Sequence, residues 1–269
     1  MVAAIAGAPI AHSLSPVIHN AWIEAAGLDA VYIALEPRGL GDLVRAARGG
    51  LIRGLNVTAP FKAEALALAD RPSERAVRAG SANLLTFELD GTVRADNTDG
   101  EGLLAAFAEQ APGFDPAAGP VVILGAGGAA SGAVAAFVEA GAPRVRVVNR
   151  SPARAQALAT AFGPVVEAVS LGEVGDAIAD ANAVINATPV APEFSLETAP
   201  QTAVIMDMVY RPLATPLLVR ARARGLRAVD GLAMLIGQAR PSFEAFFGVR
   251  PPPNLDVRAK SIAYLESAA

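Results

Sequence analysis

Residues 121–130 read VVILGAGGAA, and their pattern is the strongest indication of the fold in this chain. Its four leading apolar residues are typical of a strand that is buried on both faces. The glycines that follow satisfy the pattern Gly-x-Gly-x-x-Ala, and the apolar run over 133–140 predicts a helix behind them. The glycine pattern alone also fits an ordinary tight turn. A strand before it and a helix after it favour a loop that binds a dinucleotide.

Each small residue of this loop has an expected task. Gly125 permits the tight turn, Gly127 lets the backbone approach a pyrophosphate, and Ala130 allows the helix to pack closely against the strand. The N-terminus of the helix then receives the phosphates, because its free N–H groups and its dipole favour anions. The loop residues expected to contact the cofactor are Gly125, Ala126, Gly127, Gly128 and Ala129.

The next predicted strand, 145–148, ends in side chains that favour a phosphorylated ribose. An NAD-preferring site commonly has Asp or Glu at this position, whereas this chain has Asn149. Arg150 and Arg154 can hold a 2′-phosphate bidentately, and Ser151 can add a hydroxyl donor. We therefore expect NADP as the cofactor. The alternative interpretation is a solvated basic turn.

Apolar strand-like runs alternate with Ala-rich helical stretches along the chain. The predicted strands lie at 2–5, 31–35, 51–57, 121–124, 145–148, 183–185 and 204–206. This alternation is typical of an α/β fold with largely parallel sheets. Residues 81–94 break the rhythm with two short strands around Asp90-Gly91, so we expect a mixed sheet in the first half. At 269 residues the chain is long enough for two domains.

Composition excludes several classes of protein. The chain has no cysteine, two histidines and a formal net charge of −4. Disulfides and thiolate metal sites are excluded, and the carboxylates show no metal-ligand spacing, so we expect no metal. The net charge argues against a nucleic-acid or membrane partner, and no apolar run reaches the roughly 20 residues of a membrane helix. We expect a cytoplasmic protein with a small-molecule substrate, and a homodimer stays open.

Polar side chains gather at predicted strand ends in the first half of the chain. They are Ser13, Ser15, Asn56, Thr58, Lys62, Asn83, Asn97, Thr98 and Asp99. Hydroxyl and amide groups suit a substrate with a carboxylate and hydroxyls. A Lys near an Asp supplies the proton transfer that accompanies hydride transfer at an alcohol. Taken singly, the Ser, Thr and Asn residues are more often turn or cap residues, and a lone Lys is usually a surface charge.

Taken together and in order, these residues resemble the shikimate dehydrogenase family. The matching stretches are 7–16 with His19-Asn20, 56–62, Asn97-Thr98-Asp99, 125–130, Asn149-Arg150-Ser151 with Arg154, 186–189, 207–210, and 230–235 with Gln238. No single stretch is diagnostic. Their joint order is specific, and it covers almost the whole chain.

The resemblance implies roles for the matching residues. Ser13 and Ser15 are implied to bind the substrate carboxylate, and Lys62 with Asp99 is implied to form the catalytic pair. The residues implied to hold ring hydroxyls are Asn56, Thr58, Asn83, Asp99 and Gln238. Tyr210 is implied to bound the substrate. The residues implied to complete the cofactor site are Thr188, Met208 and Gly231.

The resemblance also implies the fold and the reaction. A mixed α/β substrate domain, 1–101, is completed by C-terminal helices within 238–269. A Rossmann-type, doubly wound NADP-binding domain spans 102–237, and the active-site cleft lies between the two domains. The implied reaction is the NADP-dependent, reversible reduction of 3-dehydroshikimate to shikimate, a step of chorismate and aromatic amino acid biosynthesis.

Alternatives stay open at this point. Within the same lineage they are a quinate/shikimate and an aminoshikimate dehydrogenase. From another class, a non-catalytic NADP sensor is conceivable, but it has no need for both Lys62 and Asp99. The chain departs from the family pattern at Ala82, Leu84, Ala191 and Ala233. We expect the first two departures to affect the substrate pocket and the third to affect a loop near the nicotinamide.

Overall fold

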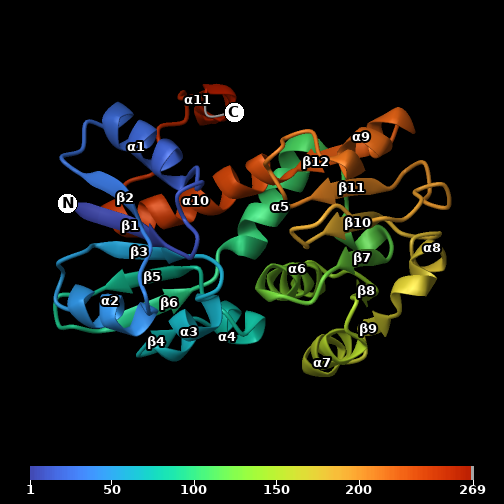
Figure 1. Cartoon of the computed structure of the whole chain (residues 1–269), viewed down its shortest axis with the longest axis horizontal. Helices are drawn as coiled ribbons and strands as arrows, with labels where there is room; N and C mark the ends of the chain where they lie inside the picture. Colours follow the sequence, from blue (N-terminus) through green and yellow to red (C-terminus); the bar gives the residue numbers. More distant parts are fainter. Residues whose placement is uncertain (268–269) are drawn as a thin grey trace. The chain divides into compact units, whose positions relative to one another are not determined.

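The computed structural model describes residues 1–267 as two compact units (Figure 1). The first unit holds Met1–Thr98 together with the chain from Leu235 onward, and the second unit holds Asp99–Met234. Each unit has its own sheet and its own core. Residues 268 and 269, the end of the span 238–269 that the sequence assigns to the substrate domain, lie outside the described residues.

A mixed six-stranded sheet in the order β2-β1-β3-β5-β6-β4 forms the first unit. Its strands are β1 (Val2–Ala6), β2 (Val31–Leu35), β3 (Gly54–Val57), β4 (Arg71–Pro72), β5 (Leu84–Phe87) and β6 (Val93–Asp96). β1 pairs in parallel with β2 and β3, whereas β5 runs antiparallel to β3 and to β6. The predicted mixed sheet and its hairpin are confirmed. The predicted strand 51–57 begins only at Gly54, because Leu51 lies exposed in a turn.

Helices cover the sheet of the first unit. The helices α2 (Leu40–Ala47), α3 (Lys62–Ala67) and α4 (Glu74–Ala79) pack on the face that carries Leu55 and Leu85. The helices α1 (Ser15–Ala25) and α10 (Gly231–Phe247) bring aromatic rings against Tyr32 of β2. The last described helix, α11 (Val257–Ser267), packs on α1.

In the second unit, six parallel strands lie in the order β12-β11-β10-β7-β8-β9. They are β7 (Val121–Leu124), β8 (Val145–Val148), β9 (Val166–Val169), β10 (Ala183–Asn186), β11 (Val204–Asp207) and β12 (Arg227–Asp230). This is the strand order of a doubly wound dinucleotide-binding sheet, so the predicted Rossmann-type fold is confirmed. The sequence did not predict β9 and β12. Both are edge strands whose apolar runs are short, because β9 contains Glu167 and β12 has a charged residue at each end, Arg227 and Asp230.

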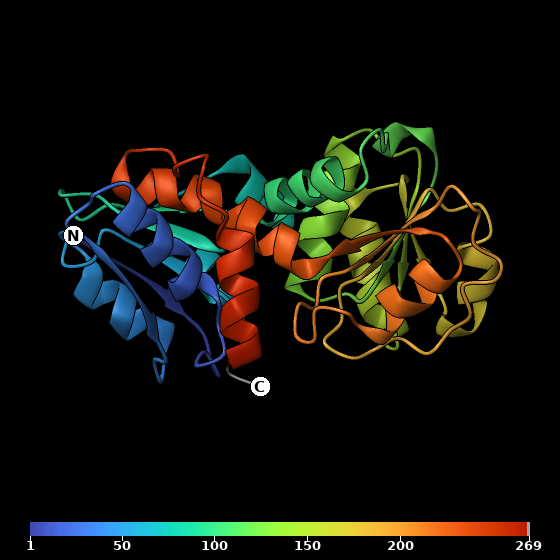
Figure 2. The ribbon, with the colours of Figure 1, turned by 90° about the horizontal axis from the view of Figure 1, so that it is seen from above.

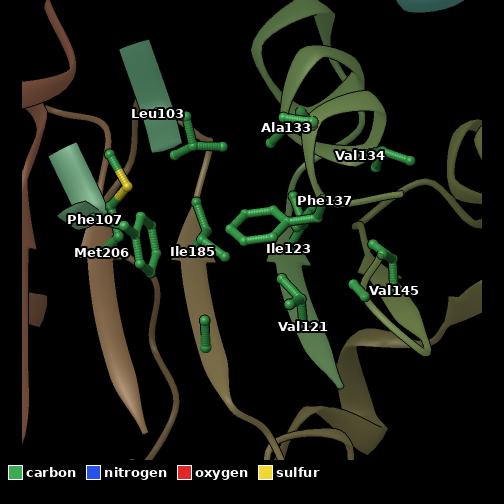
Figure 3. Packing of buried hydrophobic residues seen from close by; sticks show 14 of the residues in the cluster. Leu103, Phe107, Val121, Ile123, Ala133, Val134, Phe137, Val145, Ile185 and Met206 are labelled. Atoms are coloured by element: carbon green, nitrogen blue, oxygen red, sulfur yellow. The ribbon is translucent and has the colours of Figure 1, made fainter. Parts of the chain in front are cut away.

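Two layers of helices bury this parallel sheet. The helices α5 (Asp99–Gln110), α6 (Gly128–Glu139) and α7 (Pro152–Phe162) cover one face, and α8 (Val174–Ala177) and α9 (Pro216–Ala223) cover the other (Figure 2). Along β7, Val121 and Ile123 point into the core under α5, α6 and α7, where Phe137 of α6 lies against them (Figure 3). The alternate residues Val122 and Leu124 belong to the core on the opposite face of the sheet, under α8 and α9. Burial on both faces explains the unbroken apolar run of β7.

The described part of the chain contains neither a membrane-spanning helix nor a cluster of metal-ligating side chains. No helix in residues 1–267 is long and apolar enough to cross a membrane. In the same residues, no group of three or more His, Cys, Asp or Glu side chains could hold a metal ion.

Candidate active site

The topology of the first unit brings the predicted substrate residues to one edge of its sheet. β1 and β3 are parallel, so the loops that carry Ser13 and Thr58 leave the sheet at the same edge. β5 is antiparallel to β3, so Asn83 lies there too, and its carbonyl oxygen accepts from the Val57 N–H at 2.9 Å. β6 is antiparallel to β5 and ends at this edge, where Thr98 follows.

Ser13 and Ser15 lie at the start of α1. The Ser15 N–H donates to Ser13 Oγ at 3.2 Å, which fixes the two residues in one turn. Ser15 is 5% exposed, and its hydroxyl makes no hydrogen bond within the described residues. A hydroxyl without an internal partner is available to donate to a bound carboxylate.

Thr58 and Lys62 follow β3 in a short loop and the first residue of α3. The Thr58 N–H donates to the Ala6 carbonyl at 2.9 Å, which fixes the loop to the end of β1. The Lys62 carbonyl accepts from the Ala82 N–H at 2.9 Å, directly before Asn83 in the chain. Backbone hydrogen bonds therefore hold the predicted catalytic Lys beside a segment that carries a predicted ligand.

Three amide side chains of the first unit form one hydrogen-bond network. Asn83 Nδ2 donates to Gln238 Oε1 at 3.1 Å and to Thr98 Oγ1 at 3.0 Å. Asn83 Oδ1 accepts from the Thr98 N–H at 2.8 Å. Asn56 Nδ2 donates to the Asn83 carbonyl at 3.0 Å. The fold thus brings together three predicted ligands from distant parts of the chain.

Asp99 and Tyr210 belong to the second unit. Asp99 follows Thr98 directly in the chain, begins α5 and is 2% exposed. Tyr210 is half-buried and follows β11. The predicted pairing of Asp99 with Lys62 and the predicted contact of Tyr210 with the substrate stay predictions.

The glycine-rich loop of the second unit fits the backbone of a dinucleotide site. Gly125 has φ +116°, and a Cβ there would lie 3.1 Å from Thr188 Cγ2 and 3.2 Å from the Ala187 carbonyl oxygen. Gly127 is exposed, and a Cβ there would meet no atom within 4 Å. The loop therefore closes tightly at Gly125 and leaves open space at Gly127, where α6 begins.

A cavity of about 570 Å³ lies at the carboxyl ends of the strands in this unit. Residues that the sequence assigns to the cofactor line it, namely Gly125, Ala126, Gly127, Asn149, Arg150, Arg154 and Thr188. Gly128 and Ala129 continue from this loop into α6, and Ser151 is the N-cap residue of α7. Met208 and Gly231 follow the ends of β11 and β12.

The arginines of this region fall into two kinds. Arg144 and Arg146 form ion pairs with Glu167, and Arg146 also pairs with Asp180. Arg150 and Arg154 are exposed at the cavity and form no ion pair within the described residues. Two guanidinium groups without a carboxylate partner suit a doubly charged phosphate. Glu193 also lines the cavity.

Two residues that the sequence analysis gave no role hold the cofactor loops together. Asn186 Oδ1 accepts from the Thr188 hydroxyl at 2.7 Å, and Asn186 Nδ2 donates to Asp207 Oδ1 at 2.9 Å. The same carboxylate oxygen accepts from the Val209 N–H at 3.1 Å. The pair ties the loop after β10 to the loop after β11. Both residues lie in stretches that resemble the shikimate dehydrogenase family, and that resemblance was the one signal in the sequence that could have drawn attention to them.

The departures from the family pattern lie in different places. Leu84 lines a separate cavity of about 290 Å³ together with Thr86 and Ala245, and that cavity contains none of the predicted substrate ligands. Ala82 is fully buried in the core. Ala191 lines the cavity of about 570 Å³, and Ala233 is buried in the first turn of α10.

Two family models match the chain. The model of the shikimate dehydrogenase substrate binding domain matches residues 5–85. The model of shikimate / quinate 5-dehydrogenase matches residues 108–222. The first match lies in the first unit and the second match lies in the second unit.

Similar proteins match along the whole length. The shikimate dehydrogenase (NADP(+)) of Caulobacter vibrioides is 55% identical over 273 residues, which cover 98% of this chain and 96% of the relative. The structure of shikimate 5-dehydrogenase from Thermus thermophilus in complex with shikimate matches with a TM-score of 0.88, 36% identity and 99% coverage of both chains. Quinate dehydrogenase from Corynebacterium glutamicum in complex with NAD matches with a TM-score of 0.89, 31% identity and 99% coverage of both chains.

Proposed function

The chain belongs to the shikimate dehydrogenase family, and on that premise we propose that it catalyses the reversible, NADP-dependent reduction of 3-dehydroshikimate to shikimate. The observation that carries the proposal is the full-length match to an NADP-dependent shikimate dehydrogenase. The exposed arginines of the cofactor cavity support it, because a 2′-phosphate needs cations that no carboxylate neutralises.

In this proposal the first unit supplies most of the substrate ligands, and the second unit supplies Asp99 and Tyr210. Ser13 and Ser15 donate hydrogen bonds to the carboxylate, which is the only charged group of shikimate. Thr58, Asn83 and Gln238 hold the ring hydroxyls, and Asn56 contributes within the same network. Tyr210 bounds the ring. A site that pairs each substrate hydroxyl rejects analogues that lack one, because a buried partner is then left unpaired.

Lys62 and Asp99 carry the proton. During reduction the carbonyl oxygen of the substrate gains negative charge as hydride reaches the carbonyl carbon. The Lys62 ammonium group donates a hydrogen bond to that oxygen, stabilises the charge and supplies the proton. Asp99 orients the hydroxyl and the ammonium group, so the two residues act as one unit. In the oxidation direction the same pair accepts the proton.

Bound NADPH supplies the hydride, and the second unit holds it. Arg150 and Arg154, which line the cavity, would hold the 2′-phosphate, and Asn149 and Ser151 would contribute at the ribose. The free N–H groups at the start of α6, which begins after Gly127, would hold the pyrophosphate. Thr188, Met208 and Gly231 would contribute at the nicotinamide end.

Initial rates with shikimate and quinate, each with NADP and with NAD, test this proposal. We expect the highest kcat/KM for shikimate with NADP. A higher kcat/KM for quinate would favour the quinate/shikimate alternative. The same assay with aminoshikimate tests the aminoshikimate alternative, which a higher kcat/KM for that substrate would favour. Tight NADP binding without turnover of any of these compounds would favour a sensor.

A cytoplasmic location and a homodimer complete the proposal. A biosynthetic reaction that consumes NADPH fits the reducing cytoplasm, and the absence of cysteine in the sequence is compatible with it. Sedimentation equilibrium of the purified protein tests the dimer. A single species at the mass of one chain would contradict it.

A further inference from the structure

Tyr32 of β2 lies outside the predicted site, yet its hydroxyl reaches the network of predicted ligands. The hydroxyl donates to Asn56 Oδ1 at 2.8 Å. The opposite end of the same amide, Nδ2, faces the Asn83 carbonyl at 3.0 Å and Ser242 Oγ at 2.8 Å. Turning the amide round would set Oδ1 against the Asn83 carbonyl, and two acceptors repel. The phenol therefore satisfies the amide in its one favourable orientation.

The Asn56 amide connects three elements. It lies on β3, it holds the turn of Asn83 through the carbonyl, and it holds α10 through Ser242. The Ser242 hydroxyl in turn donates to the Gln238 carbonyl at 3.2 Å, and the Thr98 hydroxyl donates to the same carbonyl at 3.1 Å. A loosened Asn56 amide would therefore loosen both Asn83 and Gln238.

Tyr32 is itself held from two sides by α1. Asn20 Nδ2 donates to the Tyr32 carbonyl at 2.8 Å, and Asn20 Oδ1 accepts from the Tyr32 N–H at 2.9 Å. Because β2 is an edge strand, these bonds replace those of a missing neighbouring strand. The His19 ring stacks on the phenol with a centroid distance of 4.1 Å and an interplanar angle of 4°.

His19 contacts Tyr32 through the flat face of its ring and not through a hydrogen bond. It is 0% exposed, and neither ring nitrogen has a hydrogen-bond partner among the described residues. Burial lowers the pKa of His19 to about 3, so the ring is neutral near neutral pH. Burial also raises the pKa of Tyr32, which keeps the phenol a donor. A neutral ring can lie flat on the phenol without the cost of burying a charge.

We propose that Tyr32 is a positioning residue for substrate binding: held by His19 and Asn20, it donates to Asn56 and so fixes the places of Asn83 and Gln238. This inference rests on the proposed function, because it takes Asn83 and Gln238 as ligands of the substrate hydroxyls. It also gives a role to His19-Asn20, a pair that matches the family but belongs to no predicted contact.

The central test is Tyr32→Phe, which removes only the hydroxyl. Asn56 Oδ1 then becomes a buried acceptor without a donor. If the free energy of that lost hydrogen bond appears in substrate binding, the KM for shikimate should rise by roughly 3- to 30-fold. We expect kcat to change much less, because Lys62 and Asp99 are untouched. The Kd for NADPH, measured by fluorescence titration, should equal that of the wild type. Tyr264→Phe on α11, where the side chain is 44% exposed, is the matched control and should change neither constant.

Ser242→Ala removes the partner at the other end of the amide and supplies an independent variant. It should raise the KM for shikimate in the same way, and the double variant should show less than the product of the two single effects, because both act through Asn56. An unchanged KM in Tyr32→Phe, in an enzyme whose wild type turns over shikimate, would overturn the positioning role. A wild type without activity on shikimate would instead refute the proposed function.

Discussion

The two units use different groups at their predicted binding residues. In the second unit the predicted cofactor contacts come largely from the backbone, with a turn at Gly125, open space at Gly127 and the start of α6. In the first unit the predicted substrate contacts come from side chains, and Asn56, Asn83 and Gln238 hold one another through their amides. A site made of backbone is sensitive to an added Cβ. A site made of amides and hydroxyls is sensitive to a single removed group.

The difference also separates what each unit recognises. Phosphates need positive charge and free N–H groups, which a helix start and two arginines can supply. A substrate with several hydroxyls needs donors and acceptors at fixed positions, and a network in which each amide is held by another provides that order. Substitutions of the amide ligands and of the glycine-rich loop should therefore affect different kinetic constants.

Lys62→Ala should have the largest effect and should confine it to turnover. Removal of a general acid and base lowers kcat by about 10²–10⁴-fold, whereas a structural Lys costs far less. The Kd for NADPH should stay at the wild-type value, because the cofactor residues lie in the second unit. Steady-state kinetics and fluorescence titration measure the two constants.

A double-mutant cycle of Lys62→Ala with Asp99→Asn tests whether Asp99 is the catalytic partner of Lys62. If the two residues act as a unit, the combined loss should fall well short of the product of the single losses. Losses that multiply fully would assign independent roles to the two side chains. Wild-type turnover in Lys62→Ala would leave Asp99 or water as the proton carrier.

Gly127→Ala should weaken NADPH binding without weakening the fold. The added Cβ meets no protein atom within 4 Å, but it occupies the space in which the pyrophosphate is expected. Overpacking of this kind costs about 1–3 kcal/mol, which corresponds to roughly 5- to 150-fold in Kd. Gly125→Ala should lower the melting temperature as well, because its φ of +116° strains any residue with a Cβ. Equal melting temperatures of the two variants would contradict the contrast.

Arg150→Asp should shift cofactor preference by about tenfold or more, since it removes a charge-assisted hydrogen bond from an exposed phosphate site. The ratio of kcat/KM for NADP to that for NAD should fall, and the KM for shikimate should stay near the wild type. Arg144→Asp is the matched control, because Arg144 pairs with Glu167 and does not line the cavity. An unchanged ratio in Arg150→Asp would refute the assignment of the 2′-phosphate.

Local sequence patterns carry the predictions for the cofactor half, whereas those for the substrate half depend on tertiary contacts. The strand, the glycine loop, the helix and the Asn149-Arg150 turn are local, so their pattern can be read within 35 residues of sequence, 121–155. The contact of Asn83 with Gln238 depends on how β5 and α10 meet, and no local pattern encodes it. Only the resemblance to a family brought these residues together before the structure did.

Other features escaped sequence analysis because they mimic ordinary core or surface. His19 and Tyr32 look like aromatic core residues, and only the hydrogen bond from Tyr32 to Asn56 reveals a connection to the site. Asn186 and Asp207 lie at the ends of two apolar strands, and their pairing follows from the register of β10 and β11. The edge strands β9 and β12 were missed because one side of each lacks a neighbour, which relaxes the need for an apolar run.

The smallest expected effect concerns stability and again distinguishes the two units, because both histidines, His12 and His19, lie in the first. Burial lowers the pKa of His19 to about 3 in the folded protein, against an ordinary value of 6.5. Between these values the unfolded chain binds the proton and the folded protein does not. The contribution of the neutral His19 to the free energy of unfolding is therefore fully present above about pH 6.5 and is lost progressively as the pH falls towards 3. Between pH 7 and 5.5 the loss is about 1 kcal/mol.

His19→Phe should abolish this dependence while keeping a ring against Tyr32. Urea unfolding at the two pH values gives the free energies, and the informative quantity is their difference, since the substitution also changes packing. The carboxylates with lowered pKa values, such as Asp70 beside Arg48, titrate below their ordinary value of 3.8 and do not contribute in this window. His12→Gln, at an exposed position, is the control and should keep the wild-type difference. If His19→Phe loses as much stability on acidification as the wild type does, the buried ring is not the titrating group, and the acid sensitivity must lie elsewhere in the chain.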